Sequence, residues 1–309
     1  MEPLFPGPLR PDATIGIIAP SGAPETATLE KGIVKIEAQG YTVRRAANLT
    51  EKTHFTAGTG RTRLEETVRL FLDHNIDAII CARGGDGGIH LLPDLIRKLN
   101  GVTPKPFVGY SDITLLQLGL FQAYGWVTFS GPMVATELGA NTLSDHAEHR
   151  YWQMLTSSPE QWDLTPPDQS DLGSIRSGTA RGTLLGGCLS IICALLGSTH
   201  FPDMRNAILI IEDTDEEPRH IDRMLHQLRL NGIYDQIGGM VLGQFTNCFP
   251  EDSTANFSLR ELVLDATDGY NFPILMNYPY GHHTPELMTL PLGAPVRMNT
   301  DPPGLFLNF

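Results

Sequence analysis

Residues 107–114 read FVGYSDIT and mark an abrupt junction between two kinds of local structure. An apolar run stops at a glycine, and an apolar pattern with helical spacing resumes directly after Ser111 and Asp112. A strand that turns this sharply into a helix resembles a nucleophile elbow, with an exposed hydroxyl and an amide at a helix N-terminus. No glycine follows within two residues, as G-x-S-x-G would require, and a Ser-Asp pair also serves as an ordinary N-cap. The stretch alone therefore predicts a strand-to-helix turn and leaves catalysis open.

The residues on either side of this turn alternate between strand and helix patterns. Strands are expected at residues 14–19, 41–44, 78–82, 106–109 and 126–129, with helices at 28–39, 60–74, and after 88 and 111. This alternation implies an α/β fold with a mostly parallel sheet covered by helices on both faces. Ligands bind beyond the carboxyl ends of the strands in such sheets. We therefore expect the loop at 83–88 and the Ser111 turn to face one crevice.

The chain changes character after residue 136 and again near residue 178. Residues 137–177 are polar and rich in turns, so we predict a linker region between a domain at 1–136 and a domain at 178–309. The second domain should be a smaller, mixed β/α unit. Its expected elements are a glycine-rich helix from residue 186, strands at 207–211 and 239–243, helices at 219–230 and 258–267, and short strands at 275–278, 288–292, 296–299 and 305–308.

Composition and charge narrow the class of protein. The 309 residues carry a formal net charge of −13 and 41% hydrophobic residues, which is ordinary for a globular enzyme. The acidic balance argues against nucleic-acid partners and against anionic membrane surfaces. The first residues lack the pattern of a secretory signal, and the longest apolar run, 184–196, is too short to span a bilayer. We therefore expect a cytoplasmic protein.

The cysteines support the same expectation. The chain has four, with no C-x-x-C pair and no zinc spacing, and Cys81, Cys188 and Cys193 lie in apolar runs. They are typical of buried free thiols in a reducing compartment.

The sequence RGGDGG at residues 83–88 follows an expected strand. It lacks the Lys-Ser/Thr of a P-loop and the G-x-G-x-x-G order of a dinucleotide fingerprint. It is either a plain turn or a loop of exposed amides that can bind a carboxylate or donate to an oxyanion.

Two further segments carry groups suited to acid–base chemistry. Residues 211–217 read IEDTDEE. Most of these acidic residues can complement the dipole at the start of the following helix. Glu212 differs, because it directly follows an apolar strand and should be rigid and partly desolvated. No histidine or cysteine stands at ligand spacing beside these acids, so we predict no metal site. Residues 278–284 read YPYGHHT and place His282 after a glycine at a strand end. A catalytic base often lies in such a position, although loop histidines are usually solvated surface residues.

Together these segments resemble the LD-carboxypeptidases, a serine peptidase family that also contains the microcin C immunity-type hydrolases. The resemblance extends over nearly the whole chain. The segments that carry it are IAPS at 18–21, RGG at 83–85, GYSD at 109–112, FSGPM at 129–133, GTLLGG at 182–187, ED at 212–213 with Glu216, DRML at 222–225, GH at 281–282 and LPLG at 290–293.

The resemblance implies a catalytic triad in which Ser111 is the nucleophile, His282 the general base and acid, and Glu212 the group that orients His282. The chemistry fits these residue types, because serine is a poor nucleophile until a base removes its proton and imidazole needs a carboxylate to fix its tautomer. No metal and no cofactor is implied.

The same resemblance suggests which groups surround the triad. The amide of Asp112, with an amide from Gly84 or Gly85, forms the expected oxyanion hole. Arg83 and Asp86 are expected substrate-binding residues. Asp86 stands where relatives often have an aromatic residue, and Cys188 stands where they usually have asparagine.

The implied reaction is cleavage between the L-centre of meso-diaminopimelate and the terminal D-alanine of murein tetrapeptides, in cell-wall recycling. The implied structure has a Rossmann-like N-terminal domain, with the site between the domains and often in a homodimer. An immunity-type amidase is an alternative. That group typically has an extended aromatic-lined loop for the nucleobase; the sequence shows no obvious one, and residues 245–257 are the segment without an assignment. A noncatalytic murein-peptide binder is a third possibility, and a dinucleotide oxidoreductase lacks its fingerprint.

Overall fold

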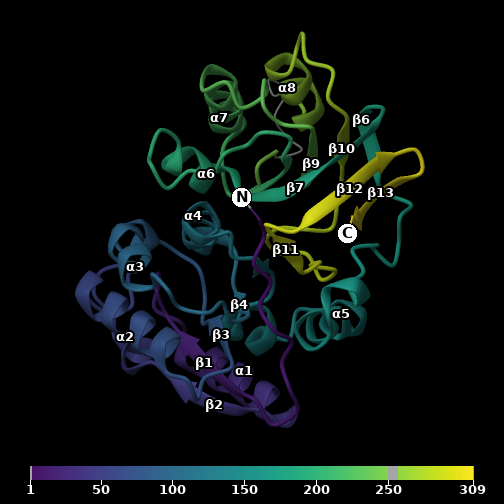
Figure 1. Cartoon of the computed structure of the whole chain (residues 1–309). Coiled ribbons are helices and arrows are strands. Elements are labelled where there is room, and N and C mark those ends of the chain that lie inside the picture. Colours follow the sequence, from purple (N-terminus) through teal and green to yellow (C-terminus); the bar gives the residue numbers. More distant parts are fainter. Residues whose placement is uncertain (1, 250–256, 309) are drawn as a thin grey trace.

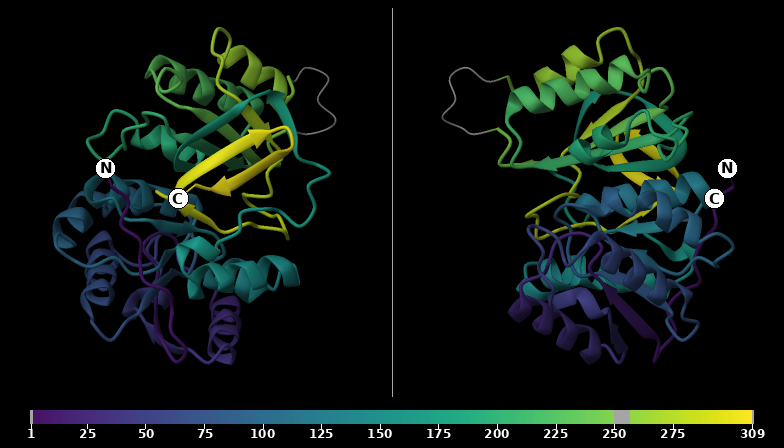
Figure 2. Two further views of the ribbon diagram at one scale, coloured as in Figure 1. Left: turned by 45° about the vertical axis from the view of Figure 1, so that its right-hand side comes forward. Right: turned by 90° about the vertical axis from the view of Figure 1, so that its left-hand side faces the viewer.

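Two β-sheets, each with its own helices, make up the protein (Figure 1). The computed structural model describes residues 2–249 and 257–308. The earlier part of the chain forms the lower lobe in Figure 2 and the later part forms the upper lobe, with an extended front of contact between them.

The N-terminal sheet has the strand order β11-β5-β4-β3-β1-β2. Its first five strands in sequence pair in parallel, and β11 joins the edge antiparallel to β5. The strands are β1 Thr14–Ile18, β2 Thr42–Arg45, β3 Ala78–Cys81, β4 Phe107–Val108, β5 Thr128–Ser130 and β11 Leu290–Leu292. The helices are α1 Thr26–Ala38, α2 Gly60–Leu72, α3 Leu92–Lys98 and α4 Thr114–Tyr124, with short turns η1 Ala47–Thr50, η2 Gly88–His90 and η3 Ser111–Ile113. Parallel neighbours need such crossovers, which explains the alternation in the sequence.

The C-terminal sheet is mixed and has the order β13-β12-β7-β8-β9-β10-β6. Strands β7 to β10 are parallel, whereas β6, β12 and β13 pair antiparallel with their neighbours. The strands are β6 Gly173–Arg176, β7 Thr179–Cys188, β8 Ile208–Thr214, β9 Gly239–Thr246, β10 Ile274–Met276, β12 Pro295–Thr300 and β13 Pro303–Leu307. The helices are α6 Leu189–Leu195, α7 Pro218–Leu230 and α8 Leu259–Ala266.

The fold class predicted from the sequence, α/β with a mostly parallel first sheet and a mixed second part, is confirmed. One element was predicted wrongly: residues 186–188 end strand β7, and the helix begins only at Leu189. Gly186 and Gly187 keep an extended path at φ of 139° and 136°, and a Cβ on Gly186 would lie 1.8 Å from the carbonyl oxygen of Ile210. Gly186 therefore lets the β8 backbone approach, and Gly187 leaves room for the Thr114 side chain, which an apolar helix pattern does not reveal.

Two segments occupy positions that the sequence pattern did not indicate. β11 comes late in the chain yet extends the N-terminal sheet, and β6, within residues 137–177, extends the C-terminal sheet. A π-helical turn, η4 Val134–Leu138, crosses the start of this region, which also holds α5 Asp145–Thr156 and η5 Pro159–Gln161. The domain boundaries at 136 and 178 stay a prediction.

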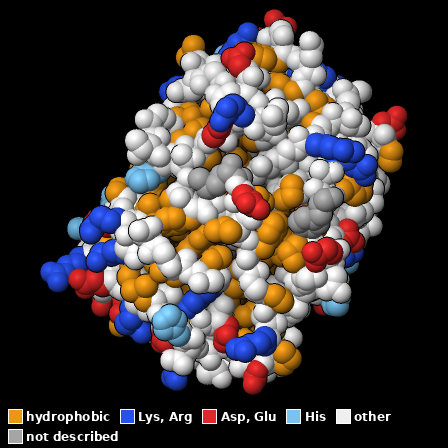
Figure 3. Space-filling view, viewed as in Figure 1, with side chains coloured by type: hydrophobic (Ala, Val, Ile, Leu, Met, Phe, Trp, Pro, Cys, Tyr) orange, Lys and Arg blue, Asp and Glu red, His pale blue; other side chains and the backbone are white. Residues whose placement is uncertain are grey.

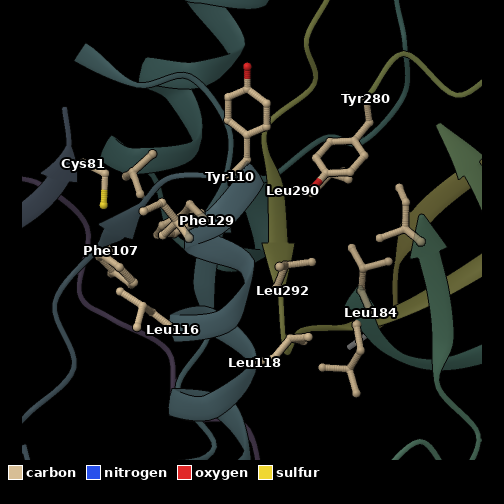
Figure 4. Close-up of a cluster of buried hydrophobic side chains, with 14 of the residues drawn as sticks. Cys81, Phe107, Tyr110, Leu116, Leu118, Phe129, Leu184, Tyr280, Leu290 and Leu292 are labelled. Carbon is tan, nitrogen blue, oxygen red and sulfur yellow. The ribbon is translucent and has the colours of Figure 1, made fainter. Parts of the chain in front are cut away.

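A continuous apolar core connects the two lobes. In Figure 4, Leu290 and Leu292 of β11 lie between Phe129 of the first sheet and Leu184 and Tyr280 from the second half of the chain. Tyr280 also forms a hydrogen bond of 2.7 Å with Ser130 Oγ, both groups being buried. Because this contact joins β5 to the loop that carries His282 and His283, the core fixes one half of the candidate site against the other.

The surface side chains, the cysteines and the helix lengths bear on the class of protein. Acidic, basic and hydrophobic side chains are interspersed over the face shown in Figure 3. All four cysteines are buried free thiols, as the sequence predicts for Cys81, Cys188 and Cys193. No helix within residues 2–249 and 257–308 combines the length and the apolarity needed to cross a membrane.

Candidate active site

Ser111 lies on the turn that connects β4 to η3 and α4. Its backbone has φ of 64°, in the left-handed region that non-glycine residues avoid. Backbone strain of this kind costs on the order of 1–3 kcal/mol and persists only where the surroundings enforce it. The preceding Gly109 has Ile113 within 3.1 Å of where its Cβ would stand, so the turn is tight. This is the geometry of a nucleophile elbow.

The glycine loop after β3 passes directly over the Ser111 hydroxyl. A Cβ added to Gly84 would lie 2.8 Å from Ser111 Cβ and 3.0 Å from Ser111 Oγ. Gly85 has φ of 110°, which favours glycine. Among the described residues, neither Gly84 nor Gly85 donates its amide to any acceptor. Two unpaired amides beside a hydroxyl are suited to stabilising negative charge.

Asp112 ties this turn to two other loops through its side chain, a role that the sequence did not indicate. Its buried Oδ2 accepts a hydrogen bond of 2.5 Å from Ser21 Oγ and one of 2.7 Å from the Gly88 amide. Burial raises the pKa of Asp112, and these two hydrogen bonds oppose the shift. The opening loop, the glycine loop and the elbow therefore share one anchor.

Glu212 and His282 meet at the end of the C-terminal sheet, 70 residues apart in sequence. His282 Nδ1 lies 2.7 Å from Glu212 Oε2, which also accepts the His282 amide at 3.3 Å. Glu212 is fully buried near the end of β8, while the His282 side chain is 14% exposed. Gly243 and Gly281 leave the space for this pair, because a Cβ on either would lie within 3.2 Å of the Glu212 side chain.

The electrostatics of the pair favour a base that faces the cavity. Burial raises the pKa of Glu212, and the hydrogen bond and charge of His282 oppose that shift. Burial alone would lower the pKa of His282, but the hydrogen bond and charge of Glu212 outweigh it and raise the pKa. With Nδ1–H donating to Glu212, Nε2 is the nitrogen left to accept a proton.

Tyr110 and Glu137 form a wall beside His282 that sequence reasoning missed. The Tyr110 ring lies 4.8 Å from the His282 ring between centroids, and its hydroxyl donates to Glu137 Oε1 at 2.6 Å. Glu137 Oε2 accepts the Met133 amide at 3.0 Å, which fixes the carboxylate at the π-helical turn. π-Helical turns often mark functional sites, so in the structure η4 points to Glu137. Sequence periodicity does not reveal such a turn, so the sequence carries no signal for this residue.

A cavity of about 700 Å³ joins these groups. It is lined by Arg83, Gly85, Tyr110, Ser111, Thr136, Glu137, Ala140, Thr142, Thr214, Asp215, Gly281, His282, His283, Thr284, Pro285 and Leu287. Ser111 and His282 thus face the same space, an arrangement that the resemblance implies and that the sequence patterns alone do not predict. No hydrogen bond joins Ser111 Oγ to His282 among the described residues.

The other expected residues are distributed differently. Arg83 lines the cavity and its Nε is buried without a hydrogen-bond partner in the described part of the chain. Asp86 is exposed and is not one of the lining residues. Cys188 lies behind the site, where its amide donates to Thr114 Oγ1 at 3.4 Å and its thiol lies 3.5 Å from Asp213 Oδ1. It therefore helps to join the lobes without facing the cavity.

Comparison with known protein families accounts for both halves of this site. Residues 15–131 match the LD-carboxypeptidase N-terminal domain, and residues 181–298 match the LD-carboxypeptidase C-terminal domain. The chain belongs to the LD-carboxypeptidase family. The first match contains Ser111 and the glycine loop, and the second contains Glu212 and His282. The lining residues Thr136, Glu137, Ala140 and Thr142 lie between the two matches.

Alignments with individual relatives cover most of the chain. A probable murein peptide carboxypeptidase of Bacillus subtilis is 33% identical over 96% of this chain and 91% of its own length. The microcin C7 self-immunity protein MccF of Escherichia coli is 28% identical over 97% and 94%. The crystal structure of muramoyltetrapeptide carboxypeptidase from Oxalobacter formigenes has a TM-score of 0.81, with 27% identity over 95% and 97%. This LD-carboxypeptidase family member therefore resembles both carboxypeptidases and a self-immunity protein.

Proposed function

We propose that the protein is a serine LD-carboxypeptidase that removes the terminal D-alanine from murein tetrapeptides. The strongest support is that Ser111 and His282 line one cavity while Glu212 forms a hydrogen bond with Nδ1 of His282. The family membership and the names of the carboxypeptidase relatives support the same reaction class.

In this proposal His282 Nε2 takes the proton of Ser111 Oγ as the oxygen attacks the carbonyl of the meso-diaminopimelate L-centre. The resulting oxyanion accepts hydrogen bonds from the Asp112 amide and from the amide of Gly84 or Gly85. Neither glycine amide has another acceptor among the described residues. His282 then protonates the leaving amine of D-alanine, and water releases the acyl group by the same steps in reverse. Glu212 holds the tautomer and stabilises the imidazolium.

The substrate carries a terminal carboxylate, and Arg83 is the one lysine or arginine among the residues that line the cavity. A guanidinium binds a carboxylate bidentately, so we assign Arg83 to the D-alanine carboxylate. Asp86 is exposed and belongs to the approach to the site at most.

The setting of the reaction is part of the same proposal. Buried free thiols suit a reducing compartment, so we propose a cytoplasmic enzyme of murein recycling whose hydrolysis uses neither metal nor cofactor. From the family resemblance we also propose that it acts as a homodimer.

The second candidate is an immunity-type amidase, favoured by the 28% identity to MccF over 97% of the chain. Its nucleobase-binding loop would fall at residues 245–257, of which 250–256 lie outside the described residues. Phe245 and Phe249, which are described, pack against the core. Phe257, at the other end of this segment, is 64% exposed and accessible to a base, so the segment does not exclude the amidase. We favour the carboxypeptidase on the higher identity to the murein peptide carboxypeptidase, 33% against 28%.

The decisive experiment measures release of D-alanine from L-Ala-D-Glu-meso-diaminopimelate-D-Ala by the wild type and by Ser111→Ala. We expect release by the wild type alone, with no change after dialysis against a chelator. Hydrolysis of an aminoacyl sulfamoyl nucleoside but not of the tetrapeptide would favour the amidase. Binding of the tetrapeptide without hydrolysis of either would favour the noncatalytic binder, and release by both variants would exclude Ser111 as the nucleophile.

A further inference from the structure

Three potential metal ligands converge where α7 packs against α8, on a surface that the catalytic proposal does not use. Asp222 and His226 stand one turn apart on α7, and Asp265 lies in the last turn of α8. His226 Nε2 is 3.6 Å from Asp222 Oδ1 and 3.1 Å from Asp265 Oδ2. One ligand atom from each residue lies within 4.8 Å of the other two.

The two separations from His226 Nε2 are close to those in a tetrahedral metal shell. With zinc–ligand distances of about 2.0–2.1 Å, neighbouring ligand atoms lie roughly 3.3 Å apart. The two distances from His226 Nε2 lie on either side of that value, so small side-chain rotations complete the geometry. One imidazole nitrogen with two carboxylates suits Zn²⁺, whereas Ca²⁺ and Mg²⁺ prefer oxygen ligands throughout.

The backbone that carries the ligands is held in place. Arg229, also on α7, donates through Nη1 to the Ala266 carbonyl at 2.9 Å and to the Asp265 carbonyl at 3.4 Å. Leu225 of α7 and Val263 of α8 are fully buried. The two helices therefore meet in one register, and the ligands do not need a large backbone movement to bind a metal.

The cluster is also open to water. Its three residues line a cavity of about 650 Å³, together with Pro218, Arg219, Phe257, Glu261 and Leu262. Arg219 is paired with Glu217, and Glu261 caps its own helix through Ser258, so neither is a free competitor for the ligands. A water molecule can complete the fourth position.

We propose that Asp222, His226 and Asp265 bind one Zn²⁺ ion, with water as the fourth ligand, and that the ion braces α7 against α8. Binding uses the lone pair of His226 Nε2, so the imidazole carries its single proton on Nδ1 in the bound form. None of the three lines the Ser111 cavity, so the ion takes no part in hydrolysis.

The test compares His226→Gln and Asp265→Asn with a matched control on the same helix. His220 also faces a carboxylate one turn away, Glu216 at 2.9 Å, but no second one within residues 2–249 and 257–308, so His220→Gln is the control. Zn²⁺ is titrated calorimetrically into the chelator-treated full-length chain at pH 7.5, and Co²⁺ is titrated with visible absorption as the readout. We expect one equivalent to bind the wild type and His220→Gln, and affinity to fall by about 100-fold in His226→Gln and Asp265→Asn.

Thermal unfolding gives a second readout. Excess Zn²⁺ should raise the midpoint of the wild type and of His220→Gln and leave that of His226→Gln unchanged, because only a native-state site shifts the equilibrium. Equal affinity in wild type and His226→Gln would overturn the proposal and point to His282 and His283 at the catalytic cavity. Absence of saturable binding would overturn it as well. Neither result affects the proposed hydrolysis, which is measured separately by D-alanine release in the presence of chelator.

Discussion

The two halves of the candidate site reach their working form by different means. On the N-terminal side, Ser111 depends on the backbone: its φ of 64° exposes the hydroxyl, and Gly84 passes directly over it. On the C-terminal side, the Glu212–His282 pair depends on burial, because Glu212 is fully buried and shares its hydrogen bonds with His282. One half is set by conformation and the other by desolvation.

This difference teaches where function and stability should separate. A side chain on a strained turn contributes little to packing, so its removal should change turnover while the fold is kept. A buried carboxylate bound to a histidine shapes both the proton affinity of the base and the energetics of its surroundings. Substitutions in the second half should therefore change the pH profile, which substitutions in the first half should leave in place.

Ser111→Ala should have the largest effect on activity. We expect kcat for D-alanine release to fall by roughly 10⁵–10⁶-fold, as for removal of other serine nucleophiles. The midpoint of thermal unfolding should stay within a few degrees of the wild-type value. Ser111→Gly should be equally inactive but more stable by on the order of 1 kcal/mol, since glycine adopts φ of 64° without strain. A loss of stability in both variants would contradict the assignment of strain to this turn.

Glu212→Gln should lower kcat by roughly 10⁴-fold, since a neutral amide neither orders the tautomer nor stabilises the imidazolium. His282 must be neutral to accept a proton, and Glu212 raises its pKa. In the wild type, kcat/KM should therefore fall as the pH drops through the raised pKa of His282.

Glu212→Gln tests the direction in which Glu212 shifts the pKa of His282. Without the carboxylate, burial remains and lowers the pKa of His282, so the acidic limb should move to lower pH in Glu212→Gln. Glu217→Gln, at an exposed position five residues later, is the control and should keep the wild-type profile. An unshifted limb in Glu212→Gln would show that another group controls the pH dependence.

Gly84→Ala should reduce kcat by roughly 10²–10³-fold, the effect of disturbing an oxyanion-hole donor. The added methyl would stand 2.8 Å from Ser111 Cβ, so either the loop or the nucleophile must shift. Gly7→Ala is the matched control, because nothing lies within 4 Å of its added Cβ. Wild-type turnover in Gly84→Ala would mean that the glycine loop yields without cost and does not position the oxyanion.

Asp112→Ala should reduce stability more than the substitutions of Ser111 or Gly84. It leaves Ser21 Oγ and the Gly88 amide without their shared acceptor, which should lower the free energy of unfolding by about 1–3 kcal/mol. Urea denaturation of this variant beside Asp94→Ala, an exposed aspartate paired only with Arg97, would measure the difference. Equal midpoints would remove the anchoring role of Asp112.

Asp86→Asn should have the smallest effect. Its exposed carboxylate does not line the cavity, so kcat/KM should change by no more than about twofold, the range of an ordinary surface substitution. Substrates with and without the free amine of diaminopimelate should be compared. A large loss confined to the amine-bearing substrate would show that Asp86 reaches the bound peptide.

Sequence patterns indicated much of the fold because they reflect local preferences. Alternating apolar runs gave the parallel strands of the first sheet, and the abrupt FVGYSDIT junction gave the Ser111 turn. The same local reasoning misassigned the glycines before Cys188, since an apolar run with glycines has no period that separates strand from helix. The close approach of Gly186 to the Ile210 carbonyl is a tertiary contact and decided the strand.

By itself, the sequence determined the alternation of strands and helices, the elbow and the residue types available for acid–base chemistry, because these follow from neighbours in the chain. Only the tertiary structure brought His282 to Glu212 across 70 residues, placed β11 in the first sheet and set Tyr110 and Glu137 beside the base. These features depend on long-range packing and on which polar groups lose water together, and neither is encoded in a local pattern.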